Sequence, residues 1–217
     1  MKRNIRLFTC AIIGGFLSVT YPSFAYAQAI DEKKSVEHQH HGAELSAEQF
    51  SADSLYQLQS QWKTNLDNRF VFGSQKGQTN IVSMFYTTCT AVCPVLVQNL
   101  KRIERHLANV GIPKPHFILV TFDPVRDTEK ILNRYAKQHV LTPDGWTLLR
   151  GSEEDTLELS VLLGMKYRAD GSSGFSHSNI ISVLDEDGKI IHQHIGIKLS
   201  DADISEISSA LMQKKLE

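Results

Sequence analysis

The 217-residue sequence has little excess charge of either sign. Lys and Arg number 23 against 24 Asp and Glu, which leaves a formal net charge of −1. Binding to DNA or RNA depends on an excess of Lys and Arg that neutralises phosphate groups. We therefore expect no nucleic-acid partner.

Long hydrophobic runs are also scarce, and the main one lies near the N-terminus. Three basic residues fall within the first six positions, apolar residues fill positions 7–19, and Ala-Tyr-Ala follows at 25–27. This order is typical of a secretory signal peptide. The apolar run is shorter than the roughly 20 residues that span a bilayer. We predict that residues 1–27 are a cleaved signal that directs export to the periplasm; an uncleaved inner-membrane anchor is the alternative.

Cysteine is rare, and cleavage of this signal would leave two, Cys89 and Cys93. A structural disulfide usually closes a long loop, because the entropic gain grows with loop length. A three-residue spacer gains little in this way. We therefore expect the pair to be kept for its reactivity, either toward metals or in redox exchange.

Few apolar residues occur between the predicted signal and the rest of the chain. Residues 28–44 are polar and include His38, His40 and His41. Such a segment cannot bury enough apolar surface to fold alone, so we predict a flexible linker. Its histidines could bind metal ions weakly, or they could be solvent-exposed residues without a specific role. Residues 45–217 then form one domain of ordinary size.

The two cysteines follow a strand-like segment and precede a helix-like one. Residues 81–86 are an apolar run, and Cys89-Thr-Ala-Val-Cys93-Pro94 comes directly after it. Proline suits the first turn of a helix and disfavours a helical conformation in the residue before it. We expect a helix from Pro94, with both sulfurs at or just before its N-terminus. There the helix dipole favours thiolate, which is both nucleophile and metal ligand.

The rest of the domain alternates between strand and helix patterns. Apolar runs and helical spacing predict strands at 70–72, 81–86, 116–122, 146–149, 180–184 and 189–195, with helices at 94–109, 127–140 and 152–163 and from Ser200 onward. Side-chain caps are expected for a short helix at Ser46 with Gln49, and for two of these helices at Ser152 with Asp155 and at Ser200 with Asp203. This order predicts an α/β domain with a thioredoxin-like fold. We expect a central mixed sheet, helices on both faces, and a β-hairpin near the C-terminus.

Three blocks of sequence resemble the Sco/SenC family of copper-binding proteins. They are Phe-Tyr-Thr-Thr-Cys-Thr-Ala-Val-Cys-Pro at 85–94, Thr-Phe-Asp-Pro-Val-Arg-Asp-Thr at 121–128, and Phe-Ser-His-Ser-Asn at 175–179. The resemblance covers about residues 50–215 and implies a thioredoxin fold. It also implies that Cys89, Cys93 and His177 ligate copper. The family usually has Pro and an acidic residue between the cysteines, where this chain has Thr90 and Ala91.

Such a ligand set suits copper, as Cu(I) or Cu(II). Sulfur favours Cu(I), and imidazole also accommodates Cu(II). Structural zinc would want a fourth protein ligand, for which no third cysteine is left. Thioredoxin-like oxidoreductases carry a cis-proline facing their cysteines, whereas this chain has no proline after Pro143 and His177 falls near that place. Asp123 ends a predicted strand on the same rim and is expected either to orient a ligand or Arg126, or to cap the entry to a helix.

These features predict a metallochaperone that delivers copper to a cuproprotein. By the resemblance, the acceptor is the dinuclear copper site of cytochrome c oxidase subunit II. A thiol-disulfide reductase is the enzymatic alternative, with Cys89 attacking and Cys93 resolving. Copper sequestration is a third possibility. Peroxiredoxin-like chemistry is disfavoured, because Tyr86 stands where those proteins have threonine.

Overall fold

The computed structural model describes residues 51–169 and 175–213, with the backbone alone described at 167–169 and 175–177. The predicted signal at 1–27, the predicted linker at 28–44 and a short helix suggested by Ser46 and Gln49 lie outside the described residues.

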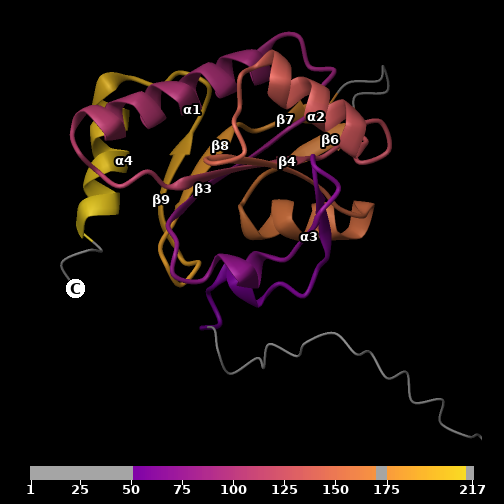
Figure 1. Ribbon diagram of the computed structural model, residues 1–217, viewed down its shortest axis with the longest axis horizontal. Coiled ribbons are helices and arrows are strands. Elements are labelled where there is room, and N and C mark those ends of the chain that lie inside the picture. Colours follow the sequence, from indigo (N-terminus) through magenta and orange to yellow (C-terminus); the bar gives the residue numbers. More distant parts are fainter. Residues whose placement is uncertain (1–50, 170–174, 214–217) are drawn as a thin grey trace, which may run out of the picture. The chain divides into compact units, whose positions relative to one another are not determined.

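A seven-stranded mixed sheet forms the centre of the domain (Figure 1). Its spatial order is β2-β1-β5-β4-β3-β8-β9. The central strands β3, β4 and β5 are parallel, and the flanking pairs are antiparallel. The strands are β1 (Trp62–Thr64), β2 (Arg69–Phe70), β3 (Asn80–Phe85), β4 (His116–Thr121), β5 (Trp146–Arg150), β8 (Ile180–Leu184) and β9 (Ile190–Ile195). A separate antiparallel pair consists of β6 (Tyr167–Ala169) and β7 (Phe175–His177).

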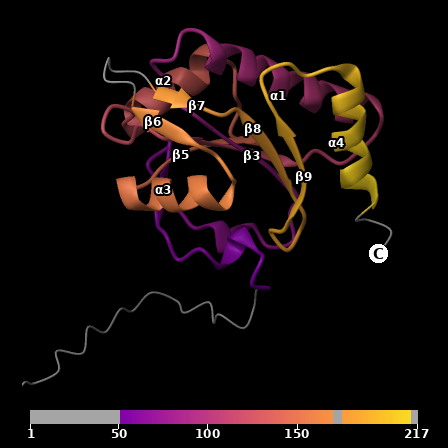
Figure 2. The same ribbon diagram turned by 180° about the vertical axis from the view of Figure 1, so that it is seen from behind.

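Helices cover both faces of this sheet. The helices are α1 (Val92–Asn109), α2 (Glu129–Gln138), α3 (Glu153–Leu162) and α4 (Asp201–Gln213), with short 3-10 turns η2 (Leu55–Gln57) and η3 (Phe72–Gln75). Figures 1 and 2 show α1 and α2 on one side and α3 on the other. Helix α4 contacts α1, β8 and β9. The predicted α/β fold, a mixed sheet between helices with a C-terminal hairpin, is confirmed.

The core lies where the parallel strands are covered on both sides. All six residues of β3 are buried, as are five of the six in β4. Strands that are covered on both faces have continuous apolar sequences rather than alternating apolar and polar residues. This is why β3 and β4 could be recognised from the sequence. The rigid core therefore ends just where the cysteine loop begins.

Several helix boundaries follow the expected side-chain caps. Ser152 and Asp155 form a reciprocal capping box at the start of α3. Ser200 and Asp203 bond in the same way at the start of α4, where Oγ of Ser200 accepts from the backbone N–H of Asp203 at 3.2 Å. These local interactions satisfy N–H groups that have no partner within the helix.

The start of α1 differs from the prediction. The helix begins at Val92, so Cys93 is helical rather than extended, and Pro94 is the third helical residue. The first N–H groups of a helix lack intrahelical acceptors, so proline is tolerated here as well as in first position. The backbone N–H of Cys93 donates to Sγ of Cys89 at 3.3 Å, so the sulfur accepts one of the N–H groups of the first helical turn.

Two smaller expectations also need correction. A strand was expected at residues 70–72, but β2 ends at Phe70 and η3 begins at Phe72, whose ring packs edge-on against Trp62. Helix α2 begins at Glu129 rather than at residue 127, because Asp127 is used in the loop before it. Among the described residues, no helix has the length and hydropathy needed to cross a membrane.

Candidate copper site

Both cysteines lie at the junction between β3 and α1. Cys89 is 8% exposed, Cys93 is fully buried, and both are free thiols. The backbone N–H of Cys89 donates to the carbonyl of Tyr86 at 3.3 Å, which forms a tight turn after the strand. The loop thus brings one sulfur near the surface and keeps the other in the core.

The two thiols differ in their acidity. Burial acts to raise the pKa of Cys89, but hydrogen bonds from the backbone and side chain of Cys93 and from the backbone of Ala91 and Val92 outweigh it, so its pKa lies below the usual value. Burial raises the pKa of Cys93, and the neighbouring charges of Cys89 and Asp127 add to the effect. The helix N-terminus therefore favours thiolate at Cys89.

A buried carboxylate, Asp127, anchors the loop that leads to the cysteines. It accepts the backbone N–H of Thr87 at 3.0 Å, the hydroxyl of Thr121 at 2.5 Å, and the hydroxyl of Thr87. Asp127 is fully buried. It therefore connects the end of β4 to Thr87, two residues before Cys89. This role of Asp127 was not predicted from the sequence.

Asp123, the acidic residue that was singled out, pairs with Arg126. Its buried carboxylate accepts from Nε of Arg126, and its backbone N–H donates to the hydroxyl of Thr121 at 3.0 Å. Arg126 was one of the two partners expected for it. A role for Asp123 in orienting a copper ligand stays a prediction.

The backbone of His177 lies at the same edge of the sheet as the cysteine loop. It is the last residue of β7 and pairs with Tyr167. Three residues later β8 begins, antiparallel to β3, and the hydroxyl of Ser83 donates to the carbonyl of Ile180 at 2.7 Å. The N-terminal end of β8 therefore meets the C-terminal end of β3. Figures 1 and 2 show β6 and β7 at the end of the molecule from which α1 starts.

The side chain of His177 is not among those that the structure describes. Within the described side chains, no group of three or more His, Cys, Asp or Glu residues is arranged to hold a metal ion. The structure thus brings Cys89 and Cys93 together and places the His177 backbone at their edge of the sheet. Ligation by His177 stays a prediction.

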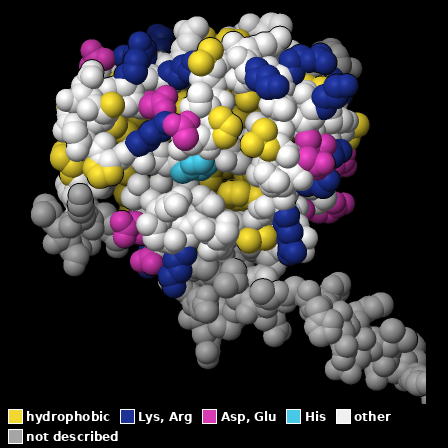
Figure 3. All heavy atoms as spheres, in the orientation of Figure 1, with side chains coloured by type: hydrophobic (Ala, Val, Ile, Leu, Met, Phe, Trp, Pro, Cys, Tyr) yellow, Lys and Arg dark blue, Asp and Glu magenta, His cyan; other side chains and the backbone are white. Residues whose placement is uncertain are grey.

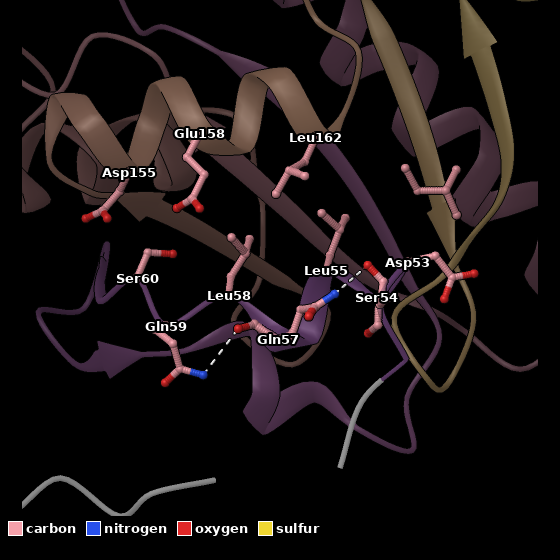
Figure 4. Close-up of a pocket in the computed structure, with 12 residues that line it drawn as sticks. Asp53, Ser54, Leu55, Gln57, Leu58, Gln59, Ser60, Asp155, Glu158 and Leu162 are labelled. Carbon is pink, nitrogen blue, oxygen red and sulfur yellow. Dashed lines mark hydrogen bonds between the residues drawn. The ribbon is translucent and has the colours of Figure 1, made fainter. Parts of the chain in front are cut away.

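The described residues also line a cavity away from the cysteines. A cavity of about 640 Å³ lies between η2 and α3 and is lined by Leu58, Asp155, Glu158 and Leu162, among others (Figure 4). It contains neither cysteine. Basic and acidic side chains are interspersed on the face shown in Figure 3.

Comparison with known proteins places the chain in a family. The SCO1/SenC family model matches residues 48–213. A curated protein of Stutzerimonas stutzeri, named for copper binding, is 27% identical over 128 residues, which cover 57% of this chain and 61% of that protein. The chain thus spans less than two thirds of that relative's length.

Solved structures share the fold. Arabidopsis thaliana ScoI with copper bound superposes with a TM-score of 0.64 at 17% identity, covering 71% of this chain and 96% of that one. BsSco is described as a member of the Sco family of cytochrome c oxidase assembly proteins that has a disulfide switch. It superposes with a TM-score of 0.60 at 21% identity, covering 70% of this chain and 91% of that one. Because the family model spans most of the chain, this protein belongs to the SCO1/SenC family.

Proposed function

We propose that this protein binds one copper ion through Cys89, Cys93 and His177 and passes it to an acceptor cuproprotein. The observation that supports this most is the pair of free, buried cysteines joined by an N–H to sulfur bond at the start of α1, in a chain of the SCO1/SenC family. Copper-bound relatives and a copper-binding curated relative support the choice of metal.

The electrostatics around the two cysteines suit a cation. Deprotonation of both thiols would place two negative charges in a buried site next to the carboxylate of Asp127, whose charge already acts on Cys93. Buried charges of one sign are costly unless a counter-ion neutralises them. A soft monovalent or divalent ion bound to both sulfurs would do so, and thiolate with imidazole favours copper over harder metals.

The expected acceptor is the dinuclear copper site of cytochrome c oxidase subunit II, met in the periplasm. The family resemblance supports this choice, as does the naming of BsSco as an oxidase assembly protein. Around the buried Cys89 the loop exposes Thr88, Thr90 and Ala91. An acceptor thiolate could approach there and replace the donor ligands one at a time, so that copper is never released into solvent.

Copper titration of the reduced protein tests the ligand set. The wild type should bind one Cu(I) per chain, and His177→Ala should weaken binding sharply. His192→Ala, a histidine substitution on β9, is the matched control and should bind like the wild type. Equal affinity of all three proteins would show that His177 is not a ligand. Binding without transfer to an oxidase subunit II fragment would favour sequestration.

One observation favours thiol-disulfide reduction as a second function of the same cysteines. The pKa of Cys89 lies below and that of Cys93 above the ordinary thiol value, as in pairs where one thiol attacks and the other resolves. At neutral pH, iodoacetamide should therefore modify Cys89 before Cys93, as read by mass spectrometry of peptides. Faster modification of Cys93 would contradict this assignment.

A further inference from the structure

Helices α1 and α2 lie on the same face of the sheet. The chain passes from β3 through α1 to β4 and from β4 through α2 to β5, and these three strands are parallel neighbours. Both connections cross the sheet in the same direction, so right-handed crossovers put both helices on one face. Figure 1 shows them there, with α3 on the opposite face. Nζ of Lys101 on α1 donates to the carbonyl of His139, just after α2. The two helices thus present a common outer surface.

This common surface carries basic side chains at helical spacing. On α2, Lys130, Arg134 and Lys137 are all exposed, and intervals of four and three residues place them on one side of the helix. On α1, Lys101 and Arg105 are four residues apart, with Arg105 exposed and Lys101 half-buried. We call these five residues the basic face. It extends over two helices.

The acidic residues of α1 and α2 do not balance this charge, because both pair with other cations. Glu104 on α1 lies 2.9 Å from Nζ of Lys114, and Glu129 on α2 lies 3.1 Å from Nη1 of Arg150. Within the part of the chain that the structure describes, no residue of the basic face forms an ion pair. Like charges four residues apart destabilise a helix. An anion from outside the chain would relieve this repulsion.

Between the two helices the surface is hollowed. The groove has a volume of about 530 Å³ and is lined by Gln98, Lys101, Arg102, Glu104, Arg105 and Val140. Arg102 pairs with Asp201 at 2.8 Å, at the flank where α4 begins. Among the described residues, Arg105 uses only Nε, in a 3.3 Å bond to the carbonyl of Lys101. Guanidinium and ammonium groups both bind phosphate oxygens. The groove can therefore take a phosphate group beside the basic stripe of α2.

The chemistry of the basic face fits lipid headgroups better than a protein. Protein interfaces are depleted in Lys and centred on buried aromatic or large apolar residues. Three residues of the basic face are Lys, and α1 and α2, which are described in full, expose one large apolar residue, Val95. The basic stripe of α2 also runs for about 10 Å along the helix, which is too far for a single phosphate group. A surface that presents many phosphate groups matches both features.

We propose that the basic face binds the headgroups of anionic phospholipids and holds the domain against a membrane surface. The opposite face of the sheet supports this orientation, because α3 has no Lys or Arg and carries Glu153, Glu154, Asp155 and Glu158. An anionic membrane therefore attracts the face that α1 and α2 form and repels the face that α3 covers. The inference concerns a surface separate from the cysteines and does not depend on the proposed copper binding.

The test measures binding of the full chain to lipid vesicles by co-sedimentation. Vesicles of phosphatidylcholine alone are compared with vesicles that also contain phosphatidylglycerol. Arg134→Gln/Lys137→Gln removes two cations of the basic face. Arg69→Gln/Lys166→Gln is the matched control, because it removes one exposed Arg and one exposed Lys outside that face. The apolar run at 7–19 is present in all three proteins, so any lipid binding by it is the same in each.

The wild type should bind the vesicles with phosphatidylglycerol more tightly, and this preference should fall as NaCl rises from about 50 mM to about 500 mM, because salt screens the charges. Arg134→Gln/Lys137→Gln should raise the Kd for these vesicles by about 25-fold, at about fivefold for each cation near an anionic surface. Its Tm should be unchanged or higher, since like-charge repulsion is reduced. The control should bind like the wild type. Equal loss in both variants, or wild-type affinity in Arg134→Gln/Lys137→Gln, would overturn the inference.

Lysine acetylation, read by mass spectrometry of peptides, tests the orientation. On vesicles with phosphatidylglycerol, Lys101, Lys130 and Lys137 should react several-fold more slowly than in solution. Lys166, which follows α3, should react at an unchanged rate. Equal protection of all four would contradict the orientation. Soluble poly-glutamate serves as an acidic protein partner. If it binds the wild type and loses affinity in Arg134→Gln/Lys137→Gln while anionic vesicles bind neither protein, the basic face meets an acidic protein and the inference is wrong.

Discussion

Replacement of the buried Asp127 should destabilise the protein and release the cysteine loop. Its carboxylate accepts three hydrogen bonds, from the backbone and hydroxyl of Thr87 and from the hydroxyl of Thr121. Hydrogen bonds to a charged group contribute roughly 1.5–3 kcal/mol each, so their gross loss would be about 4.5–9 kcal/mol. Part of this is offset, because removal of the carboxylate also removes the several kcal/mol cost of burying a charge. We expect Asp127→Ala to lower the free energy of unfolding by about 3 kcal/mol.

Urea unfolding followed by circular dichroism measures this loss. Glu158→Ala removes an exposed acidic side chain from α3 and should unfold close to the wild-type midpoint. Asp127→Asn keeps one acceptor oxygen and should fall between the two, which gives a usable result even if Asp127→Ala does not fold. Because Thr87 lies two residues before Cys89, both Asp127 variants should also make Cys89 easier to alkylate. Wild-type midpoints for both variants would refute the assigned role of the carboxylate.

Two further predictions concern stability away from the cysteines. Burial lowers the pKa of His116. The stability that His116 contributes is therefore present above the unfolded-state pKa and is lost as the pH falls through the folded-state pKa. His116→Gln should flatten the fall in the urea midpoint between roughly pH 7 and pH 5, and equal falls in both proteins would contradict this. Gly188 and Gly164 both have positive φ, but a Cβ at Gly188 would lie 2.5 Å from the ring of Tyr56 whereas one at Gly164 meets nothing within 4 Å. Gly188→Ala should consequently lower the Tm by much more than Gly164→Ala, and similar losses in differential scanning calorimetry would show that the clash is relieved.

The elements around the cysteines were predictable because their signals are local. The continuous apolar runs of β3 and β4 and the helical spacing of α1 each lie within a short window of sequence. The capping pair Ser152 and Asp155 is likewise separated by three residues. The thioredoxin-like order of strands and helices could be predicted from these elements, because short connections between them allow few topologies.

The loop contacts were not predictable in the same way. The block at 121–128 contains both Asp123 and Asp127, and their positions within the block do not tell which carboxylate turns toward the cysteine loop. Asp123 was chosen because it ends a strand, whereas Asp127 makes the bonds to Thr87. Asp127 could have been identified from the threonines Thr87 and Thr121, which lie at or just beyond the ends of two adjacent parallel strands. Both hydroxyl groups can donate to one shared acceptor between them.

The β6–β7 pair was also missed. Each strand has three residues, Tyr167–Ala169 and Phe175–His177, which is too short for alternation between apolar and polar positions to be recognised. The start of α1 was misplaced for a different reason, because the preference of residues before proline was weighed without the bond from Cys93 to the sulfur of Cys89.

X-ray absorption at the copper edge, on the Cu(I)-loaded protein, tests the central claim most directly. Two sulfur neighbours and one imidazole nitrogen are predicted for the wild type, with the imidazole scattering lost in His177→Ala and both sulfurs retained. Three or more sulfur neighbours, or an imidazole signal that survives in His177→Ala, would contradict a site built from Cys89, Cys93 and His177.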